Sequence, residues 1–436
     1  MRLAMKREIG IGLAGFGTVG AGVYKNLARN GALLEERTGT AFSVRRIAVK
    51  ALDEPRQVEA PDELFTERAD DLIEDPSIRI VIELMGGIAF PLGFVRRAIE
   101  AGKTVITANK ALLAEHGKEI FELAASKKIP VFFEAAVAGG IPIIKAVREG
   151  FVANRFESIH GILNGTSNYI LTRMTEAGLD FGPALEEARK LGYAEADPTL
   201  DVNGWDAAHK AIILASLAYG FWVDPSNVLV AGIEKITASD IRFAEALGYR
   251  IKLVATIKAD ASDEIEVRVV PTLIPKSHVL ASVNGVFNAV AVRGDVVGDT
   301  LFYGRGAGQD PTSSAVLGDL AEAAADLHSP GGSCGFASHN LYGRCKPVGD
   351  SVSKFYLRLG VEDRPGVLAQ IAGALGAADI GILSVIQPES PAEGPVPLVL
   401  TLHDAPLGRM ESAAAKLSSL PCVKGEPLLL HMESFS

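Results

Sequence analysis

Apolar runs of strand length alternate with amphipathic segments along the first third of the chain. Glu8–Ala14 is an almost unbroken apolar run, and Ala21–Ala28 has the spacing of a helix. The alternation continues with predicted strands at 44–50, 79–84, 104–107 and 130–134, and with predicted helices at 94–101 and 111–126. Strands and helices that alternate in this way form a parallel sheet with helices on both faces. The pattern therefore predicts an α/β fold with a doubly wound parallel sheet over residues 1–135.

A glycine-rich turn, GFGTVG, joins the first strand to the first helix. In this GxGxxG pattern Gly15 allows a tight turn, Gly17 lets the backbone approach a pyrophosphate, and Gly20 lets the helix pack on the strand. The unpaired N–H groups and the positive dipole of the helix N-terminus attract phosphates. We therefore predict a Rossmann-type domain that binds a dinucleotide through Gly15, Phe16, Gly17, Thr18, Val19 and Gly20. The alternative is a glycine-rich turn without a ligand.

The residues that follow the second predicted strand bear on the choice between NAD and NADP. An NAD enzyme usually has an acidic residue there, which binds the ribose 2′-hydroxyl. This chain has Lys50 at the end of the strand and Arg56 shortly after it, and basic groups suit a 2′-phosphate. We expect NADP, with NAD as the alternative because Asp53 lies nearby in the sequence.

The strand–helix alternation is lost in the middle of the chain, over residues 136–303. Strands are predicted there at 156–163, 250–257 and 265–271, and two helices between 181 and 221, which together indicate an α+β domain. A second glycine-rich turn, GRGAGQ, then opens a helix within residues 304–326. We expect this segment to return to the first domain and complete it.

The segment GYAEADPTLDVNGWDAAHK, at residues 192–210, concentrates acidic groups beside an apolar helix. Asp206 and Lys210 are spaced i, i+4, so they share one face of that helix. Carboxylates and a lysine that are held together can bind a zwitterion and transfer a proton. Lys110 is a further candidate, because it follows a predicted strand and ligands bind at the carboxyl ends of such strands. The alternatives are structural ion pairs in the segment and a solvated helix cap at Lys110.

A linker rich in Gly, Ser and Pro, at 327–352, precedes a segment of different character. Residues 353–436 predict the order strand, helix, strand, strand, helix, strand. This order is typical of a ferredoxin-like domain.

Composition and charge argue against several classes of protein. The formal net charge of −10, without a run of Lys or Arg, disfavours a nucleic-acid partner. No apolar stretch reaches the ~18 residues of a membrane span and no signal-peptide pattern opens the chain, so we expect a cytoplasmic protein with no membrane partner. Cys334, Cys345 and Cys422 form no CxxC pair, which predicts neither a disulfide framework nor a zinc site.

The charged segment resembles the signature of the homoserine dehydrogenase family: an alanine, G-Y/F-A, DP, D, G-x-D and a final lysine. Each part is present here, as Ala188, Gly192–Tyr193–Ala194, Asp197–Pro198, Asp201, Gly204–Trp205–Asp206 and Lys210. The motifs GFGTVG, VITANKALLA, FEAAVAGGIPII, GILNGTSNYIL and YGRGAGQDPTSSAV extend the resemblance along the chain. Residues 353–436 resemble an ACT domain, a small-molecule sensor. Since the sequence has no aspartate-kinase domain, the chain resembles the monofunctional form of the family.

The resemblance implies reversible, NAD(P)-dependent interconversion of L-homoserine and L-aspartate 4-semialdehyde, on the route to threonine and methionine. It implies that Lys210 is the general acid/base, that Glu195, Asp201 and Asp206 bind the substrate, and that Lys110 lies beside substrate and nicotinamide. It also places Lys110, Gly192, Glu195 and Gly308 at the cofactor, and Glu134, Val137, Gly139 and Ile141 at a monovalent cation, Na or K. The ACT-like domain implies a threonine effector near Asp363 and Gly366, and the family implies a homodimer or homotetramer.

Three other interpretations make different demands on the sequence. A semialdehyde dehydrogenase that works through a thiohemiacetal needs a cysteine near the nicotinamide, but every cysteine lies at or beyond Cys334. A catalytically dead amino-acid sensor would not require Lys110, Glu195, Asp206 and Lys210, which are all present. The C-terminal domain alone could also be a dimerisation module that has lost its ligand.

Overall fold

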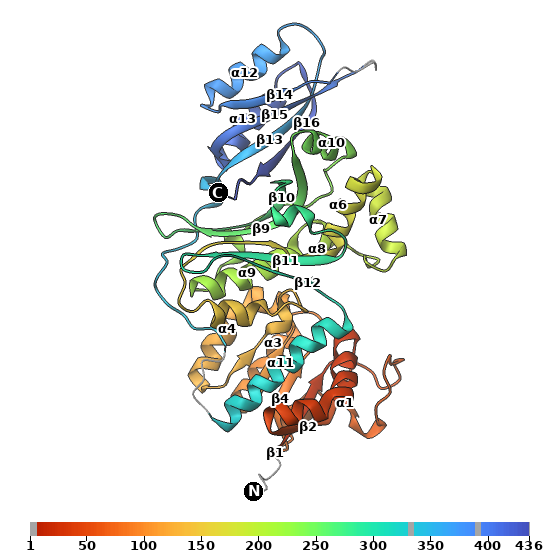
Figure 1. Cartoon of the computed structure of the whole chain (residues 1–436). Coiled ribbons are helices and arrows are strands. Elements are labelled where there is room, and N and C mark those ends of the chain that lie inside the picture. Colours follow the sequence, from red (N-terminus) through yellow and green to blue (C-terminus); the bar gives the residue numbers. More distant parts are fainter. Residues whose placement is uncertain (1–6, 330–334, 389–393, 436) are drawn as a thin grey trace. The chain divides into compact units, whose positions relative to one another are not determined.

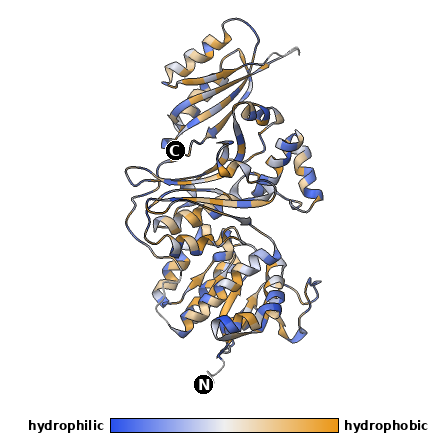
Figure 2. Cartoon of the chain, viewed as in Figure 1, coloured by the Kyte–Doolittle hydropathy of each residue, from blue (hydrophilic) through white to orange (hydrophobic). Residues whose placement is uncertain are grey.

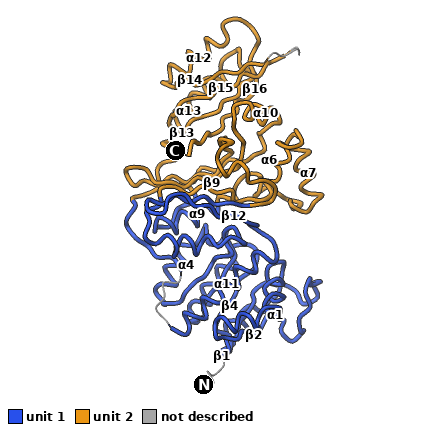
Figure 3. The backbone as a smooth tube through the Cα atoms, viewed as in Figure 1, with its two compact units in different colours: residues 1–156, 209–225, 288–342 blue, residues 157–208, 226–287, 343–436 orange. Residues whose placement is uncertain are grey.

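The computed structural model describes residues 7–329, 335–388 and 394–435 (Figure 1). The chain divides into two compact units (Figure 3). Unit 1 comprises residues 1–156, 209–225 and 288–342, and unit 2 comprises residues 157–208, 226–287 and 343–436. No helix among the described residues is both long enough and apolar enough to cross a bilayer.

Within its described residues, unit 1 contains a sheet of strand order β3-β2-β1-β4-β5-β6, in which all neighbours are parallel. Its strands are β1 Arg7–Ala14, β2 Thr40–Ala48, β3 Phe65–Thr66, β4 Ile78–Glu83, β5 Thr104–Thr107 and β6 Val131–Phe132. The order reverses direction between β1 and β4, and dinucleotides bind at the carboxyl ends of the strands at such a point. The predicted doubly wound parallel sheet is therefore confirmed.

Helices pack on this sheet because each has one apolar face. They are α1 Thr18–Thr38, α2 Asp70–Glu74, α3 Ala89–Glu100, α4 Lys110–Lys127 and α11 Gln309–His328. Ile11 and Leu13 of β1 are fully buried in one core with Val23 of α1 and Leu320 of α11. Figure 2 shows the strands as mainly hydrophobic, whereas α1 is mixed. Helix α11, which is remote in sequence, thus packs in the same core as α1.

Several predicted elements in unit 1 have different bounds in the structure; the helix predicted at 94–101, for example, is α3, which begins at Ala89. The helix predicted at Ala21–Ala28 is α1, which starts three residues earlier and continues to Thr38, because Leu34 in its second half packs on the core that α11 shares. In the first half, Asn26 bonds to Ser313 of α11. The strand predicted at 44–50 is β2, which begins at Thr40, where it pairs with Arg7 of β1, and ends at Ala48. Lys50 therefore lies in the turn after the strand.

Two further segments of unit 1 have regular structure outside the parallel sheet and the helices that cover it. Helix α5 Ile143–Lys145 continues as a π-helical turn at Ala146–Gly150. Strands β11 Phe287–Gly294 and β12 Gly298–Arg305 are neighbours in a second sheet.

Unit 2 contains antiparallel strands with helices in the connections, as expected for an α+β domain. Its central strands are β7 Phe156–Ile162, β8 Leu229–Val230, β9 Tyr249–Ala259 and β10 Ile265–Pro275. Strand β9 pairs antiparallel with both β7 and β10, and β8 pairs parallel with β10. The helices of this region are α6 Gly165–Ala177, α7 Phe181–Lys190, α8 Thr199–Val202, α9 Trp205–Tyr219 and α10 Ala238–Ala246. Unit 2 ends at Ala208, within α9, and the rest of that helix belongs to unit 1.

The C-terminal module of unit 2 has the predicted order of elements. They are β13 Val352–Val361, α12 Val367–Ala377, β14 Ile382–Ile386, β15 Val396–Pro406, α13 Leu407–Ser418 and β16 Val423–Met432. The strands lie in the order β16-β13-β15-β14 and are antiparallel, which is a ferredoxin-like arrangement. Leu357, Ile371 and Leu417 are fully buried in its core.

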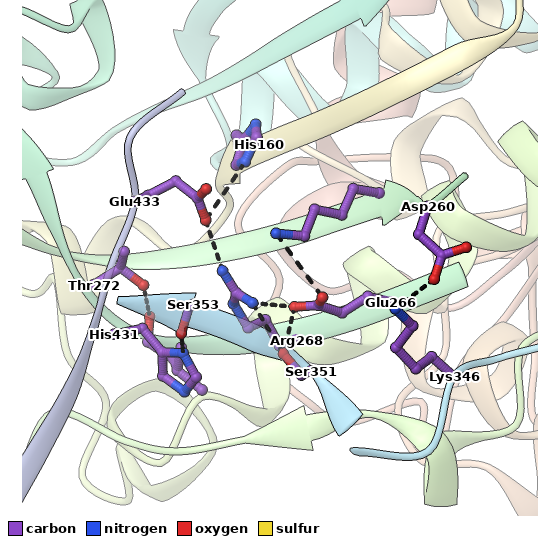
Figure 4. A network of polar contacts seen from close by, with 12 residues as sticks. His160, Asp260, Glu266, Arg268, Thr272, Lys346, Ser351, Ser353, His431 and Glu433 are labelled. Carbon is purple, nitrogen blue, oxygen red and sulfur yellow. Dashed lines mark hydrogen bonds and ion pairs between the residues drawn. The ribbon is translucent and has the colours of Figure 1, made fainter. Parts of the chain in front are cut away.

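A buried polar network joins this module to β10 (Figure 4). The guanidinium of Arg268, whose side chain is 1% exposed, pairs with Glu266 on its own strand and donates to Glu433 Oε2 at 2.6 Å. Ser351 donates to Glu266 Oε1 at 2.8 Å. Backbone pairing continues the junction, because Thr272 of β10 is in parallel register with His431 of β16.

Candidate functional site

The turn from β1 to α1 has the geometry that a bound pyrophosphate requires. Gly15 has a φ of +106°, and a Cβ there would lie 2.6 Å from the carbonyl oxygen of Leu84. A Cβ on Gly20 would lie 2.1 Å from the carbonyl oxygen of Gly15, so helix and turn are in direct contact. In the described structure no atom approaches within 4 Å of a Cβ built on Gly17, and no side chain caps α1. The exposed N–H groups of Gly17 and Thr18 thus fit a phosphate.

Arg56 lies beside this turn through two aromatic contacts. Its guanidinium lies 3.5 Å from the centroid of the Phe65 ring, and Phe65 meets Phe16 edge-on at 5.3 Å. Arg56 also donates to the carbonyl of Leu52 at 2.8 Å. Lys50 is exposed in the turn after β2. A fixed cationic plane beside the glycine turn suits the 2′-phosphate end of a dinucleotide.

The buried carboxylate of Glu83 holds the turn after β4 and the turn after β5, both at the carboxyl end of the parallel sheet. Glu83, at the carboxyl end of β4, is fully buried, and it accepts from the Thr107 hydroxyl at 2.6 Å and from the Met85 N–H at 2.8 Å. Burial raises the pKa of Glu83 to about 7, against the effect of these hydrogen bonds. Asn109 donates to the carbonyl of Gly87 at 2.9 Å and caps α4, whose first residue is Lys110. Lys110 is therefore positioned at the carboxyl end of the sheet by this network.

The segment that contains Gly308 lies against α1. Gly308 has a φ of +124° and precedes α11. The next residue, Gln309, accepts from Lys25 Nζ at 2.8 Å, and a Cβ on Gly22 would lie 2.6 Å from the Gln309 Cγ. Gly308 is thus close to the nucleotide-binding helix, as the sequence predicts for this segment.

Three of the four predicted cation residues line one cavity of about 230 Å³ in unit 1: Glu134, Gly139 and Ile141. Val137 is fully buried in the same turn. The Glu134 carboxylate accepts from the backbone N–H groups of Ile144 and Lys145, at 3.0 and 2.9 Å. Burial raises the pKa of Glu134, and burial together with repulsion from Glu134 raises the pKa of Asp319 well above its ordinary value. Two buried carboxyl groups beside carbonyl oxygens are a donor set that suits a hard cation. Among the described residues, no group of three or more His, Cys, Asp or Glu side chains could hold a metal on its own.

In unit 2 the structure brings Asp201 and Asp206 together through a residue that the sequence did not single out for this role. The side-chain amide of Asn164 donates to Asp201 Oδ1 at 2.7 Å and to Asp206 Oδ2 at 2.8 Å. Asn164 is 5% exposed and Asp206 is 9% exposed. The two acids therefore form one cluster at the junction of β7 and α6.

Lys210 and the exposed turn at residues 192–198 complete the charged segment. Lys210 is 8% exposed and lies one turn after Asp206 on α9. Just before that helix, Asn203 Oδ1 accepts from the N–H of Trp205 at 3.0 Å. Glu195 is exposed in the turn that follows Gly192, and Thr166 donates to the carbonyl of Tyr193 in that turn at 2.8 Å. Glu195 thus lies on a more open segment than the two aspartates.

The predicted effector residues, and the cysteines that the structure describes, belong to unit 2. Asp363 and Gly366 are both exposed in the turn between β13 and α12, and Gly366 has a φ of +87°. Cys422 is buried in the core of the C-terminal module, Cys345 is partly buried in the preceding segment, and Cys334 lies outside the described residues.

Asn164 and Glu83 are the polar residues that sequence reasoning missed. Asn164 stands in the motif GILNGTSNYIL, and Glu83 is the last residue of an apolar strand. An acid at the end of a buried strand and an asparagine before a helix are the signals that could have identified them.

Two protein-family models match this chain. A family model described as homoserine dehydrogenase matches residues 142–321, and one described as its NAD-binding domain matches residues 15–134. The chain is 42% identical to a homoserine dehydrogenase of Pseudomonas aeruginosa, over 99% of this chain and 100% of that protein.

Solved structures agree with this comparison. The crystal structure of a homoserine dehydrogenase from Thiobacillus denitrificans has a TM-score of 0.91 and 42% identity, and the match covers 99% of each chain. A hyperthermophilic archaeal homoserine dehydrogenase in complex with NADPH has a TM-score of 0.61 and 25% identity, over 74% of this chain and 99% of that one.

Proposed function

Because the chain belongs to the homoserine dehydrogenase family, we propose that it interconverts L-homoserine and L-aspartate 4-semialdehyde with Lys210 as general acid/base. The family makes it an NAD-binding oxidoreductase of amino-acid biosynthesis. The observation that carries the proposed mechanism is the pair of buried residues on α9, with Lys210 one turn after Asp206 and Asp206 tied to Asp201 by Asn164.

The bound nicotinamide supplies the hydride in reduction and accepts it in oxidation. Lys210 then gives a proton to the aldehyde oxygen in one direction and takes it from the hydroxyl of homoserine in the other. Its ammonium also stabilises the alkoxide character that develops on this oxygen. Glu195 binds the amino group of the substrate, Asp201 and Asp206 help to hold the substrate, and Lys110 lies beside the substrate and the nicotinamide.

The preferred cofactor is NADP, with NAD as the alternative. Gly15, Phe16, Gly17, Thr18, Val19 and Gly20 hold its pyrophosphate, with Gly192, Glu195 and Gly308 at its border. Arg56, whose guanidinium lies over the Phe65 ring beside the glycine turn, and Lys50 bind the 2′-phosphate. The NADPH complex of the archaeal relative supports this preference.

A monovalent cation, Na or K, is held by Glu134 and the backbone oxygens of Val137, Gly139 and Ile141. The support is that Glu134, Gly139 and Ile141 line one cavity, with the Asp319 carboxyl also on its wall. Positive charge at that point offsets the repulsion between the two buried carboxyl groups.

The proposed functional division assigns the cofactor to residues 1–135 and 304–326, and the substrate and subunit contacts to residues 136–303. Residues 353–436, which follow the linker at 327–352, are an ACT domain that binds threonine near Asp363 and Gly366. The ferredoxin-like strand order and the exposed turn at Gly366 support this assignment. The assembly is a homodimer or homotetramer.

Initial rates of homoserine oxidation, with NADP and with NAD, each with and without threonine, test the proposal. Turnover that favours NADP and falls with threonine is the expected result. Turnover that is insensitive to millimolar threonine would leave the enzyme assignment and remove the effector. No turnover with either nucleotide, in a folded chain that binds NADP, would instead favour a sensor without activity.

A further inference from the structure

Asn164 stands between β7 and α6 with every part of its side-chain amide engaged. Its Nδ2 donates to Asp201 Oδ1 at 2.7 Å and to Asp206 Oδ2 at 2.8 Å, and its Oδ1 accepts from the backbone N–H of Ser167 at 2.7 Å. The helix cap fixes the orientation of the amide, because the reversed orientation would turn the oxygen towards both carboxylates. Both N–H donors are used on the two acids, so neither remains for a substrate.

The side-chain amide of Asn164 offsets the repulsion between two neighbouring carboxylates. Two carboxylates that bond to the same nitrogen are close neighbours, and Asp206 is almost fully buried. Neighbouring carboxylates in a poorly hydrated site tend to share a proton, which leaves a single negative charge. Hydrogen bonds to the charged form favour that form. The Asn164 amide, which donates to both acids, therefore favours two negative charges side by side, next to the helix turn that carries the Lys210 ammonium.

The first turn of α6 holds the rest of the charged segment in the same way. The hydroxyl of Ser167 donates to the carbonyl of Asp201 at 2.6 Å, and the hydroxyl of Thr166 donates to the carbonyl of Tyr193 at 2.8 Å. Asn164, Thr166 and Ser167 thus bind three points of residues 193–206, all from one helix terminus. That concentration of contacts distinguishes this helix start from an ordinary capped helix.

We propose that Asn164 is a positioning residue for the dehydrogenase reaction, whose amide holds Asp201 and Asp206 as an ionised pair ready for the substrate. Through Asp206 it also sets the start of α9, the helix that carries Lys210. The inference rests on the proposed function, since the substrate roles of the two aspartates belong to it. Asn164 acts on the substrate through these acids and does not itself contact the reacting atoms.

Two variants test this role. Asn164→Asp keeps the shape and the cap acceptor for Ser167, but it puts a third carboxylate against the other two, which cannot all ionise. Asn164→Ser keeps a good helix cap and removes the amide donors. The matched control is Asn203→Asp, which makes the same Asn-to-Asp change in the same charged segment and keeps the acceptor for the N–H of Trp205.

We expect Asn164→Ser to lose about 10- to 100-fold in kcat/KM for homoserine, the scale of lost hydrogen bonds to charged groups, mainly through KM. Asn164→Asp should show a loss that grows with pH, because the proton shared among three carboxyl groups dissociates as pH rises. Its pH profile should therefore shift to lower pH than that of the wild type. Asn203→Asp should retain the wild-type profile, and the KM for NADP should change in none of them.

Wild-type kcat/KM and pH profile in both Asn164 variants would overturn the proposal, even if their melting temperatures fall. A variant that melts too early for assay at 25 °C is measured at lower temperature, and the second Asn164 variant decides independently. The proposed function is tested separately through Lys210→Ala. Normal turnover in that variant, with impaired Asn164 variants, would remove Lys210 from the mechanism and leave the role of Asn164 standing.

Discussion

Replacement of Glu83 by Gln should remove the pH dependence of stability that this buried carboxyl contributes. Glu83 has no exposed surface, and its carboxylate accepts from the Thr107 hydroxyl and the Met85 N–H. These two bonds favour the charged form, but burial outweighs them and raises the pKa to about 7 from an ordinary value of 4.5. Between pH 4.5 and about 7, Glu83 therefore keeps in the folded chain a proton that it releases in the unfolded chain.

The sign and size of the effect follow from this difference. Between pH 4.5 and about 7 the folded state binds more protons than the unfolded state, so stability falls as pH rises through this window and is level above it. The full loss is about 3 kcal/mol. Glu83→Gln removes this loss and keeps an acceptor for Met85, but it leaves the Thr107 hydroxyl without its acceptor, at a cost of about 1 kcal/mol. The variant should be about 1 kcal/mol less stable than the wild type near pH 5 and about 2 kcal/mol more stable at pH 8 to 9.

Thermal unfolding of both proteins from pH 5 to pH 9 measures this difference. The variant should melt first at pH 5 and last at pH 9, with the crossing point between. Glu100→Gln, which changes an exposed glutamate on α3 of the same unit, serves as control and should give a constant small difference. A constant difference for Glu83→Gln as well would refute the reasoning, because it would mean that ionisation of Glu83 costs the folded state nothing.

Three further outcomes are expected. Lys210→Ala should lose roughly 10²- to 10⁴-fold in turnover, the scale of a lost general acid, while NADP binding is retained. Arg56→Ala should raise the KM for NADP about 10-fold or more and leave the KM for NAD nearly unchanged, since only NADP carries the 2′-phosphate. Arg268→Met should destabilise unit 2 by about 3 kcal/mol, because Glu266 and Glu433 lose the buried cation that they share, while Glu266 keeps the longer pair with Lys258 at 3.9 Å; thermal unfolding measures this loss.

Each of these outcomes has a result that would contradict it. Turnover of Lys210→Ala within a few-fold of the wild type would exclude the proton-transfer role. An equal rise in both nucleotide KM values for Arg56→Ala would point to damage of the glycine turn. Arg344→Met is the control for Arg268, because Arg344 is 76% exposed and its pair with Glu264 should be worth less than about 1 kcal/mol. Equal losses in the two arginine variants would mean that burial adds nothing to the Arg268 network.

The nucleotide half of the fold could be predicted because its signals are local. The bounds of β5 at Thr104–Thr107 were predicted to the residue, since this strand is a short buried run with clear ends. The end of α1 was not, because its second half packs on a core shared with α11, which is remote in sequence. A sequence pattern shows which face of a helix is apolar, but not how far a partner helix extends.

The residues of the candidate site also divide into those with a local sequence signal and those without one. Gly15 and Lys210 belong to spacings that can be read within one motif. Asn164 meets Asp201 and Asp206 from 37 and 42 residues away, and Glu83 meets Thr107 from 24 residues away. Only the folded chain brings such groups within hydrogen-bond distance, so their roles could not be inferred from spacing.

The junction between β10 and β16 affects how the chain can fold during synthesis. Thr272 and Leu273 of β10 pair with residues of β16, and Arg268 of β10 finds one of its two carboxylate partners in Glu433. A ribosome that has completed β10 must still synthesise the whole C-terminal module before these partners emerge. Until then the end of an apolar strand and a buried arginine lack their contacts, and unpaired strands of this kind promote aggregation. A chain cut before β16 would therefore lose the strand that pairs with β10 and would also leave its last module incomplete. The central sheet and the C-terminal module thus form one folding unit.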